Sequence, residues 1–117
     1  PPKTYTDPEI VEMVQKDALK YFWDYAQSNS KLARERYLTD DPGFEANVIT
    51  TGGSGFGLMT LVVGVERGFV SRTEAVSRLT TALTFLENAD RFHGAWSHWI
   101  NGTTGKVIPS DGKGRIT

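Results

Sequence analysis

Residues 91–100, with the sequence Arg-Phe-His-Gly-Ala-Trp-Ser-His-Trp-Ile, hold both histidines of this chain and two of its three tryptophans. Large aromatic rings beside imidazoles, in a segment that follows a helical pattern, are costly to expose unless another group packs on them. Two interpretations are open from these residue types. Flat aromatic faces with hydrogen-bonding neighbours suit the stacking of a sugar ring, and they equally suit a small hydrophobic core.

A second segment that could do chemistry is glycine-rich: residues 52–57 read Gly-Gly-Ser-Gly-Phe-Gly. A phosphate-binding loop would need lysine directly after this frame, and Leu58 stands there. A dinucleotide-binding fingerprint would need glycine at position 58 or 60, and a nucleophile elbow around Ser54 would need glycine in place of Phe56. The segment is therefore interpreted either as a flexible start of a helix or as backbone that lines a ligand cleft.

The spacing of the histidines does not favour a metal site. His93 and His98 lack the i,i+4 spacing of a helical metal pair, and no carboxylate lies suitably between them. We therefore expect no metal and no cofactor. Carboxylates are plentiful, but their spacing alone assigns neither an acid nor a base, so the sequence leaves the catalytic residues unknown.

The composition excludes several classes of protein. With 117 residues the chain has the size of one domain or of a piece of a larger one. A net charge of −1 and an isoelectric point near 6.1 argue against a nucleic-acid surface. No apolar run approaches the length of a membrane span, and the absence of cysteine excludes disulfides and thiolate catalysis. Because the chain begins without a signal-peptide pattern, we expect any such peptide to have been removed already.

Hydrophobic spacing predicts three helices. The first should begin at Thr6 or Asp7 and fade around residues 28–30. Its apolar stripe comprises Val11, Val14, Ala18, Tyr21, Phe22 and Tyr25. The third should open with the capping box Ser71-x-x-Glu74 and end near Asp90. Its stripe comprises Ala75, Val76, Leu79, Leu83 and Leu86.

The second helix should run from about Ser54 to Arg67 and end at Gly68. It is apolar on every side, so it must be buried on every side, and Gly57 and Gly64 indicate close approach to a neighbour. An amphipathic helix, an apolar one and another amphipathic one therefore follow in order. This is the outer–inner–outer pattern expected where helices form two concentric layers, and the predicted class is all-α.

The remaining segments are predicted to be connectors. Residues 32–47 form a polar connector with a turn at Asp41-Pro42-Gly43, and the charged run at its start is typical of a solvated face. Near the C-terminus, residues 96–100 and 106–109 flank a turn and predict a small β-hairpin. In an up–down array the glycine-rich segment and the tryptophan-rich segment should lie at the same end of the helices.

Taken together, five segments carry a family resemblance. Residues 47–59, 64–69 and 89–100 resemble the bacterial glucoamylase-like family, which includes endo-β-1,2-glucanases. Residues 21–23 (Tyr-Phe-Trp) and 32–36 (Leu-Ala-Arg-Glu-Arg) resemble its N-terminal pattern. The resemblance covers nearly the whole chain up to Pro109, and the combined motifs are specific where any single one would be weak.

The resemblance implies a fold and a reaction. The family fold is an (α/α)6 toroid with inner and outer helices around a sugar-binding cleft. Three helices cannot close that toroid, so residues 1–117 are interpreted as one segment, the N-terminal part of a larger catalytic domain. The remainder is then either absent or supplied as a separate chain. The implied reaction is hydrolysis of a β-linked glucan with inversion and without a metal, by two carboxylates ~6.5–9.5 Å apart.

The resemblance also implies locations for the site and for the protein. The residues expected to line sugar subsites are Arg34, Arg36, Tyr37, Arg91, Trp96, His98 and Trp99. Where the sugar-binding and the core interpretations of the aromatic cluster compete, we favour the subsite for Trp99 and the core for Trp96. The family's acidic segment should follow Pro109, but residues 110–117 do not match it, which leaves Asp111 a faint candidate for a cleft carboxylate. A periplasmic or extracellular location is expected.

A different class of function stays open at this level. The chain could instead be a non-catalytic helical module that binds carbohydrate or serves as a scaffold. A carboxylate pair in the complete polypeptide would favour the enzyme. Neither the exact linkage nor endo or exo action can be predicted from these residues.

Overall fold

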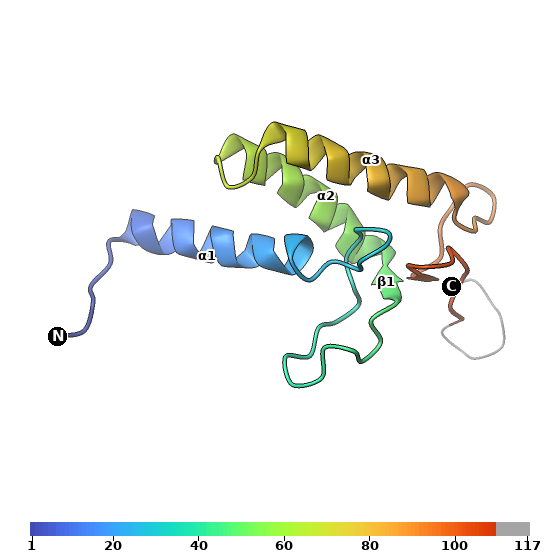
Figure 1. Cartoon of the computed structure of the whole chain (residues 1–117), viewed down its shortest axis with the longest axis horizontal. Helices are drawn as coiled ribbons and strands as arrows, with labels where there is room; N and C mark the ends of the chain where they lie inside the picture. The colour runs from blue at the N-terminus through green and yellow to red at the C-terminus, as the bar shows by residue number, and fades with distance from the viewer. Residues whose placement is uncertain (110–117) are drawn as a thin grey trace.

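The computed structural model describes residues 1–109, which hold three α-helices and two short β-strands. The elements are α1 (Asp7–Trp23), β1 (Val48–Thr50), α2 (Thr51–Glu66), α3 (Arg72–Asn88) and β2 (Trp99–Asn101). In Figure 1, α1 and α3 run from left to right and α2 runs back in the opposite direction, so that α1 and α3 both end near the strands, where α2 begins. The fold is mostly helical, with a two-stranded antiparallel sheet at one end.

Helix α1 begins with the predicted cap. Thr6 is its N-cap: the Glu9 N–H donates to Thr6 Oγ1 at 3.4 Å, and Thr6 N–H donates to Glu9 Oε1 at 3.1 Å. The helix ends at Trp23, earlier than predicted. Its buried residue is Leu19, while Val11 and Val14 of the predicted stripe are more than half exposed. The side facing α2 carries Leu19 and Phe22, so it overlaps only the C-terminal part of the stripe that the periodicity indicates.

Helix α2 begins at Thr51, slightly before the predicted start near Ser54, so residues 52–57 lie in its first turns, as in the interpretation of this segment as the start of a helix. At its end, Gly68 has φ +74°, and the N–H of Phe69 donates to the Gly64 carbonyl at 2.8 Å, which is the expected glycine C-cap. The two interior glycines do allow close approach. A Cβ on Gly57 would lie 3.0 Å from the Phe22 ring, and one on Gly64 would lie 3.2 Å from Val70.

Helix α3 has the predicted capping box, with Glu74 N–H donating to Ser71 Oγ at 3.1 Å and Ser71 N–H donating back to the Glu74 carboxylate at 3.3 Å. Its deepest residue is Ala82, which is fully buried and was not in the predicted stripe. A small side chain at this position lets α3 pack closely on the core. That core comprises Leu32, Ile49, Ala82, Ala89 and Ile100.

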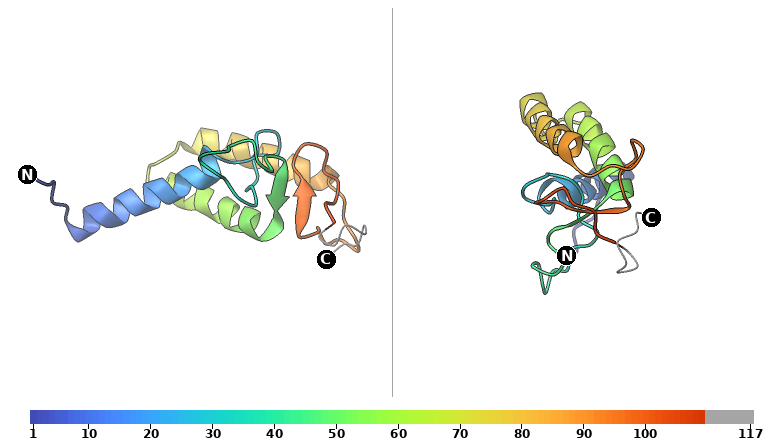
Figure 2. Two further views of the ribbon diagram at one scale, coloured as in Figure 1. Left: turned by 90° about the horizontal axis from the view of Figure 1, so that it is seen from below. Right: turned by 90° about the vertical axis from the view of Figure 1, so that its right-hand side faces the viewer.

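The C-terminal hairpin differs from the prediction. The turn at residues 101–105 is present, since Gly105 N–H donates to the Asn101 carbonyl at 2.8 Å, but its two arms are joined only around the bridge between Ile100 and Val107. The main partner of β2 is β1, with Ile49 opposite Ile100 and Thr50 opposite Trp99. Figure 2 shows the two strands side by side. Because β1 has three residues and its partner is about fifty residues away, its sequence carries little local signal.

A buried polar cluster ties the connector to this turn. Gln27 is 1% exposed; its Oε1 accepts from Ser30 N at 2.7 Å and from Asn29 N at 3.0 Å, and its Nε2 donates to Thr103 Oγ1 at 3.3 Å. A Cβ on Gly102 would lie 2.5 Å from the Gln27 side chain. This amide therefore fixes how residues 27–32 and the turn lie against each other.

Candidate functional site

The end of the molecule that holds the strands also gathers the predicted site segments, as expected from an up–down array. The Thr51 N–H, the first of α2, donates to the His98 carbonyl at 3.1 Å, and the Thr51 hydroxyl donates to the Ser97 carbonyl. These bonds satisfy backbone groups that a helix start leaves free. The prediction that the glycine-rich and tryptophan-rich segments share one end of the helices is confirmed.

The connector forms a further edge of the sheet. Thr50 N–H donates to the Ala33 carbonyl at 3.1 Å, Glu35 N–H donates to the Val48 carbonyl at 2.9 Å, and Arg34 is bridged to Ile49. Side chains alternate along each strand, so Arg34, Ile49 and Ile100 share an inner face. Glu35, together with Thr50 and Trp99, belongs to the outer, half-buried face.

On the outer face, Trp99 and Glu35 make a direct contact. The Trp99 Nε1–H donates to Glu35 Oε2 at 3.0 Å, and the His98 ring lies 5.2 Å from the Trp99 ring, centroid to centroid. The Glu35 side chain is 23% exposed. Glu35 was not among the predicted site residues, although it lies between the predicted Arg34 and Arg36 in the sequence. Alternation places Glu35 on the face opposite to Arg34 only once the connector is known to pair with β1.

Arg36 lies on the surface beside this pair. Its guanidinium is 3.5 Å from a Glu45 carboxylate oxygen and 3.9 Å from Glu35 Oε1, and its side chain is 53% exposed. Such exposed ion pairs contribute little to stability, so Arg36 is available to other partners. An imidazole and a guanidinium therefore lie close to the aromatic ring and the carboxylate of the outer face.

Arg34 is not part of the solvated face that the charged run predicts. It is 7% exposed, its Nη2 donates to the Phe44 carbonyl at 2.9 Å, and its guanidinium lies 5.0 Å from the Tyr37 ring centroid. Tyr37 in turn stacks on Tyr25 with ring centroids 4.3 Å apart. Both predicted residues therefore have structural partners within this chain.

The hydroxyl of Tyr21 donates to the Arg34 carbonyl at 2.7 Å, which ties α1 to the connector. Burial raises the pKa of this hydroxyl above its ordinary value; the Glu35 carboxylate adds to the rise and Arg34 opposes it. Tyr21 is therefore held in its neutral, hydrogen-bonding form.

Trp96 and Arg91 lie elsewhere, at the end of α3. Trp96 Nε1–H donates to the Leu86 carbonyl at 3.0 Å, and Arg91 lies 6.0 Å from the Trp96 ring centroid. Trp96 is 36% exposed, which differs from the core position expected for it. It lines a cavity of about 180 Å³ with Leu58, Leu86 and Ile100, on the inner side of the sheet. The seven predicted residues therefore do not form one surface.

A tight turn directly precedes Trp96. Phe92 and Ala95 exchange two backbone hydrogen bonds of 2.8 and 3.0 Å across His93 and Gly94. Both central residues have positive φ, +49° for His93 and +83° for Gly94, as in the tight turns of two-residue hairpins. His93 is therefore a turn residue, exposed and separate from His98.

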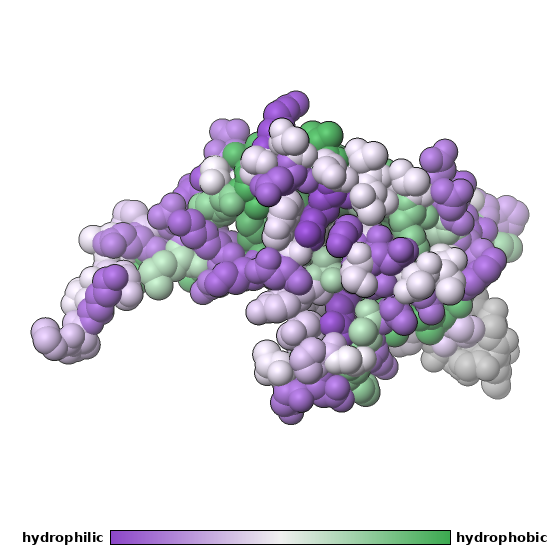
Figure 3. Space-filling model, in the orientation of Figure 1, coloured by the Kyte–Doolittle hydropathy of each residue, from purple (hydrophilic) through white to green (hydrophobic). Residues whose placement is uncertain are grey.

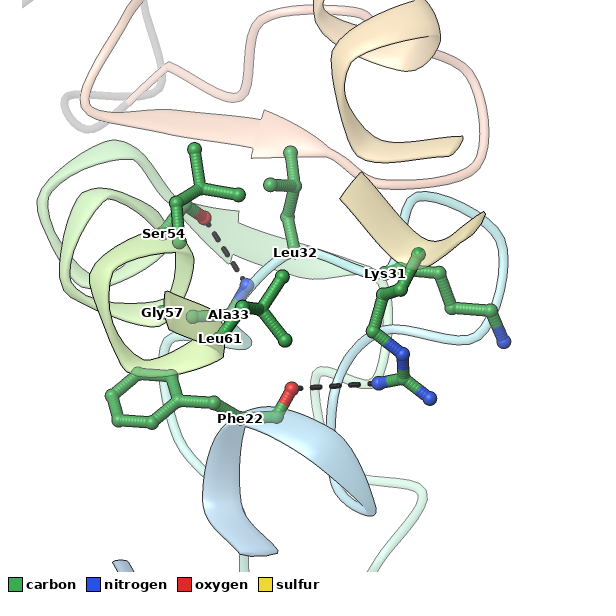
Figure 4. A pocket seen from close by; sticks show the side chains of 9 residues that line it. Phe22, Lys31, Leu32, Ala33, Ser54, Gly57 and Leu61 are labelled. Atoms are coloured by element: carbon green, nitrogen blue, oxygen red, sulfur yellow. Dashed lines mark hydrogen bonds between the residues drawn. The ribbon is translucent and has the colours of Figure 1, made fainter. Parts of the chain in front are cut away.

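A second junction holds the connector against the helices (Figure 4). The Ala33 N–H donates to Ser54 Oγ at 3.1 Å, and an Arg78 Nη1–H donates to the Phe22 carbonyl at 3.5 Å. The cavity between Phe22, Gly57 and Leu61 has a volume of about 10 Å³, enough for about one water molecule. This junction is a packing contact and too small for a sugar.

Within residues 1–109, no three His, Asp or Glu side chains lie close enough to hold a metal ion. No helix in this part of the chain is long and apolar enough to cross a membrane. Asp111, the faint carboxylate candidate, lies outside the described residues.

Comparison with known proteins gives consistent results. No family model matches the chain. The exo-β-1,2-glucooligosaccharide sophorohydrolase (non-reducing end) of Parabacteroides distasonis is 48% identical over 115 residues, an alignment that covers 95% of this chain and 15% of that relative.

Two solved structures are similar in sequence and in fold. The endo-β-1,2-glucanase of Chitinophaga pinensis, in complex with sophorotriose and glucose, is 50% identical with a TM-score of 0.88, over 92% of this chain and 26% of that one. The β-1,2-glucanase of Parabacteroides distasonis is 48% identical with a TM-score of 0.82, over 90% of this chain and 14% of that one. The chain thus spans only a part of each relative.

Proposed function

We propose that this chain, a homologue of a segment of the bacterial glucoamylase-like and β-1,2-glucanase proteins, is the N-terminal part of an (α/α)6 catalytic domain that hydrolyses β-linked glucan. One observation carries the proposal: close to half of the residues are identical, across nearly the whole chain, to proteins that are each named for activity on β-1,2-linked glucose. The three helices of alternating direction are consistent with the start of such a toroid.

The outer face of the sheet supports a role in binding sugar. Trp99 offers an aromatic ring, while His98 and Arg36 offer hydrogen-bonding groups near it. Sugars are bound by the stacking of their apolar faces on aromatic rings and by hydrogen bonds to their hydroxyls. In this proposal, Trp99, His98 and Arg36 line one part of the cleft and Arg91 a second part. Trp96 packs on the inner side of the sheet, where its Nε1–H donates to the Leu86 carbonyl.

The proposed mechanism is inverting. One protonated carboxyl group would protonate the leaving oxygen while a carboxylate on the opposite side activates water, at a separation of ~6.5–9.5 Å. Neither residue is assigned in this chain, and both are proposed to come from the rest of the polypeptide. That remainder is either continuous with this chain or supplied as a separate one.

Digestion of a β-1,2-glucan by the complete polypeptide, followed by proton NMR, tests the function and the stereochemistry. We expect α-anomers to appear first, because inversion at a β-linkage yields the α configuration. A β-1,3-glucan serves as the matched control and should be cleaved far more slowly. Immediate β-anomers would rule out inversion. Binding without release of sugar would favour the rival function, a non-catalytic carbohydrate-binding or scaffolding module.

The proposal includes a location outside the cytoplasm. A polymeric glucan is met in the periplasm or the extracellular medium, and a hydrolase that acts on it has to be exported. Cell fractionation with an antibody against this segment should find the protein in the periplasmic or secreted fraction. Recovery only with cytoplasmic markers would contradict this part of the proposal.

A further inference from the structure

The contact between Glu35 and Trp99 crosses the sheet from one edge to the other. Glu35 lies on the connector edge, Trp99 lies on β2, and β1 runs between them. The carboxylate therefore reaches over β1 to the indole at 3.0 Å. A bond of this kind links two segments that are more than sixty residues apart in sequence.

This bond is the means by which the chain fixes the Trp99 ring. An indole has one donor, Nε1–H, and satisfying it selects one of the two broad orientations of the ring about its second side-chain torsion. The Trp99 backbone is held separately: its carbonyl accepts from Ser97 Oγ at 2.6 Å and from Ile108 N at 3.1 Å. The backbone thus places the residue, and Glu35 orients the ring.

The second oxygen of Glu35 has a much weaker partner. Its Oε1 lies 3.9 Å from the Arg36 guanidinium, which is itself 3.5 Å from Glu45. An exposed pair at that distance contributes little, whereas the bond to the indole is charge-assisted and half-buried. The strongest contact of the Glu35 side chain is therefore its hydrogen bond from Trp99.

We propose that Glu35 is a positioning residue of the glucan site, which orients the Trp99 ring for stacking on a sugar. The identity of the bound sugar rests on the proposed function, whereas the contact between Glu35 and Trp99 rests on the geometry alone. Positioning differs from a catalytic role, in which the carboxylate would exchange a proton with the glycosidic bond. The positioning role has two consequences: the Trp99 ring is fixed in the free protein, and a sugar that stacks on the ring binds more tightly.

Two substitutions in the complete polypeptide test this role. Glu35→Ala removes the acceptor, and Glu35→Gln keeps an amide oxygen in its place. With sophorotriose as the probe, we expect the KM to rise about threefold for Glu35→Ala, which is less than the loss of the stacking ring itself would cause, and by less than about twofold for Glu35→Gln. The kcat should stay within about twofold of the wild-type value in both.

A second readout reports on the ring itself. Fluorine NMR of protein labelled with 5-fluorotryptophan, with the Trp99 resonance assigned through Trp99→Phe, should show that resonance shifted and broadened in Glu35→Ala. It should be partly restored in Glu35→Gln. Glu45→Ala is the matched control, because it removes the carboxylate that lies nearer to Arg36 and leaves the contact between Glu35 and Trp99 intact. Its fluorine spectrum should match that of the wild type.

The outcomes separate the two proposals. An unshifted Trp99 resonance in Glu35→Ala would overturn the positioning role, and so would a kcat lowered more than a hundredfold in both Glu35 variants, which would make the carboxylate catalytic. Wild-type protein that neither binds nor cleaves sophorotriose would contradict the proposed function. The fluorine spectra would still decide whether Glu35 orients Trp99.

Discussion

At the end that holds the strands, residues 33–35, β1 and β2 are joined by backbone hydrogen bonds, and Ile49 and Ile100 are each 1% exposed. Along α2, by contrast, Phe56, Met59 and Val62 are each about two-thirds exposed. In Figure 3, hydrophobic residues are visible between the polar surfaces of α1 and α3, where α2 passes. The first region satisfies its polar groups and buries its apolar ones within this chain, and the second leaves an apolar stripe without a partner.

This difference separates the part of the proposed toroid that is complete within this chain from the part that needs further helices. Between α1 and α3, α2 is covered on two sides, with Leu61 and Gly64 buried. The stripe that carries Phe56 and Met59 faces neither neighbour. In the proposed toroid, further helices would cover it, whereas the strands already have their partners.

The largest effect that the comparison predicts is self-association of residues 1–117 on their own. Burial of a large apolar side chain stabilises a contact by about 1.5–3 kcal/mol, and the stripe offers Phe56, Met59, Val62 and Val63. Analytical ultracentrifugation should find oligomers, and replacing Phe56 and Val62 by serine should shift the distribution toward monomer. A compact, cooperatively melting wild-type monomer would contradict the view that this chain needs partners.

Much of the helical fold is predictable because its signals are local. The capping box at Ser71 and the glycine C-cap at Gly68 depend on residues within one turn of each other, and the structure contains both. The start of α2 is different. Glycines at 52 and 53 disfavour a helix, and the bonds that stabilise it there come from Ser97 and His98, far along the chain.

The candidate site was less predictable for the same reason. Trp99 and Arg36 were predicted from the family resemblance together with their residue types, but their closeness in space depends on the pairing of β1 with β2 and with the connector. Without that register, the alternation that separates Arg34 from Glu35 could not be assigned to an inner and an outer face. The link that Gln27 makes to the turn was missed because two of its partners, Asn47 and Thr103, come from distant segments.

The next effect concerns the core of the strand end. Ile100→Ala should lower the free energy of unfolding by about 2–5 kcal/mol, since it empties a fully buried site. Val62→Ala removes a side chain that is 70% exposed in this chain and should change it by less than about 0.5 kcal/mol. Urea titration of both variants in a Phe56→Ser background, at a concentration at which ultracentrifugation finds a monomer, checks the contrast. Equal losses there would mean that the Val62 side chain is covered within the monomer.

A smaller effect separates the two tryptophans. Trp99→Ala in the complete polypeptide should weaken sophorotriose binding by on the order of 1 kcal/mol, the value of an aromatic stacking contact, which is roughly five- to tenfold in Kd. Trp96→Ala, on the inner side of the sheet, should lower the melting temperature more than it changes the affinity. Calorimetric titration and thermal melts of both variants test this. A Trp99→Ala protein with a much lower melting temperature and an unchanged Kd would show that Trp99 is a core residue and does not bind sugar.

The smallest expected effect concerns the contact between α1 and the connector, where the Tyr21 hydroxyl donates to the Arg34 carbonyl. Tyr21→Phe should cost about 0.5–1 kcal/mol at neutral pH, because it removes one partly exposed neutral hydrogen bond. The folded-state pKa of Tyr21 is raised, so its contribution is fully present below the unfolded-state pKa near 10 and is lost as the pH rises through the folded value. Urea titrations at pH 7 and at about pH 11 should therefore show the advantage of the wild type over Tyr21→Phe shrinking at the higher pH. An advantage that stays constant would mean that ionisation of Tyr21 is not linked to the contact between α1 and the connector.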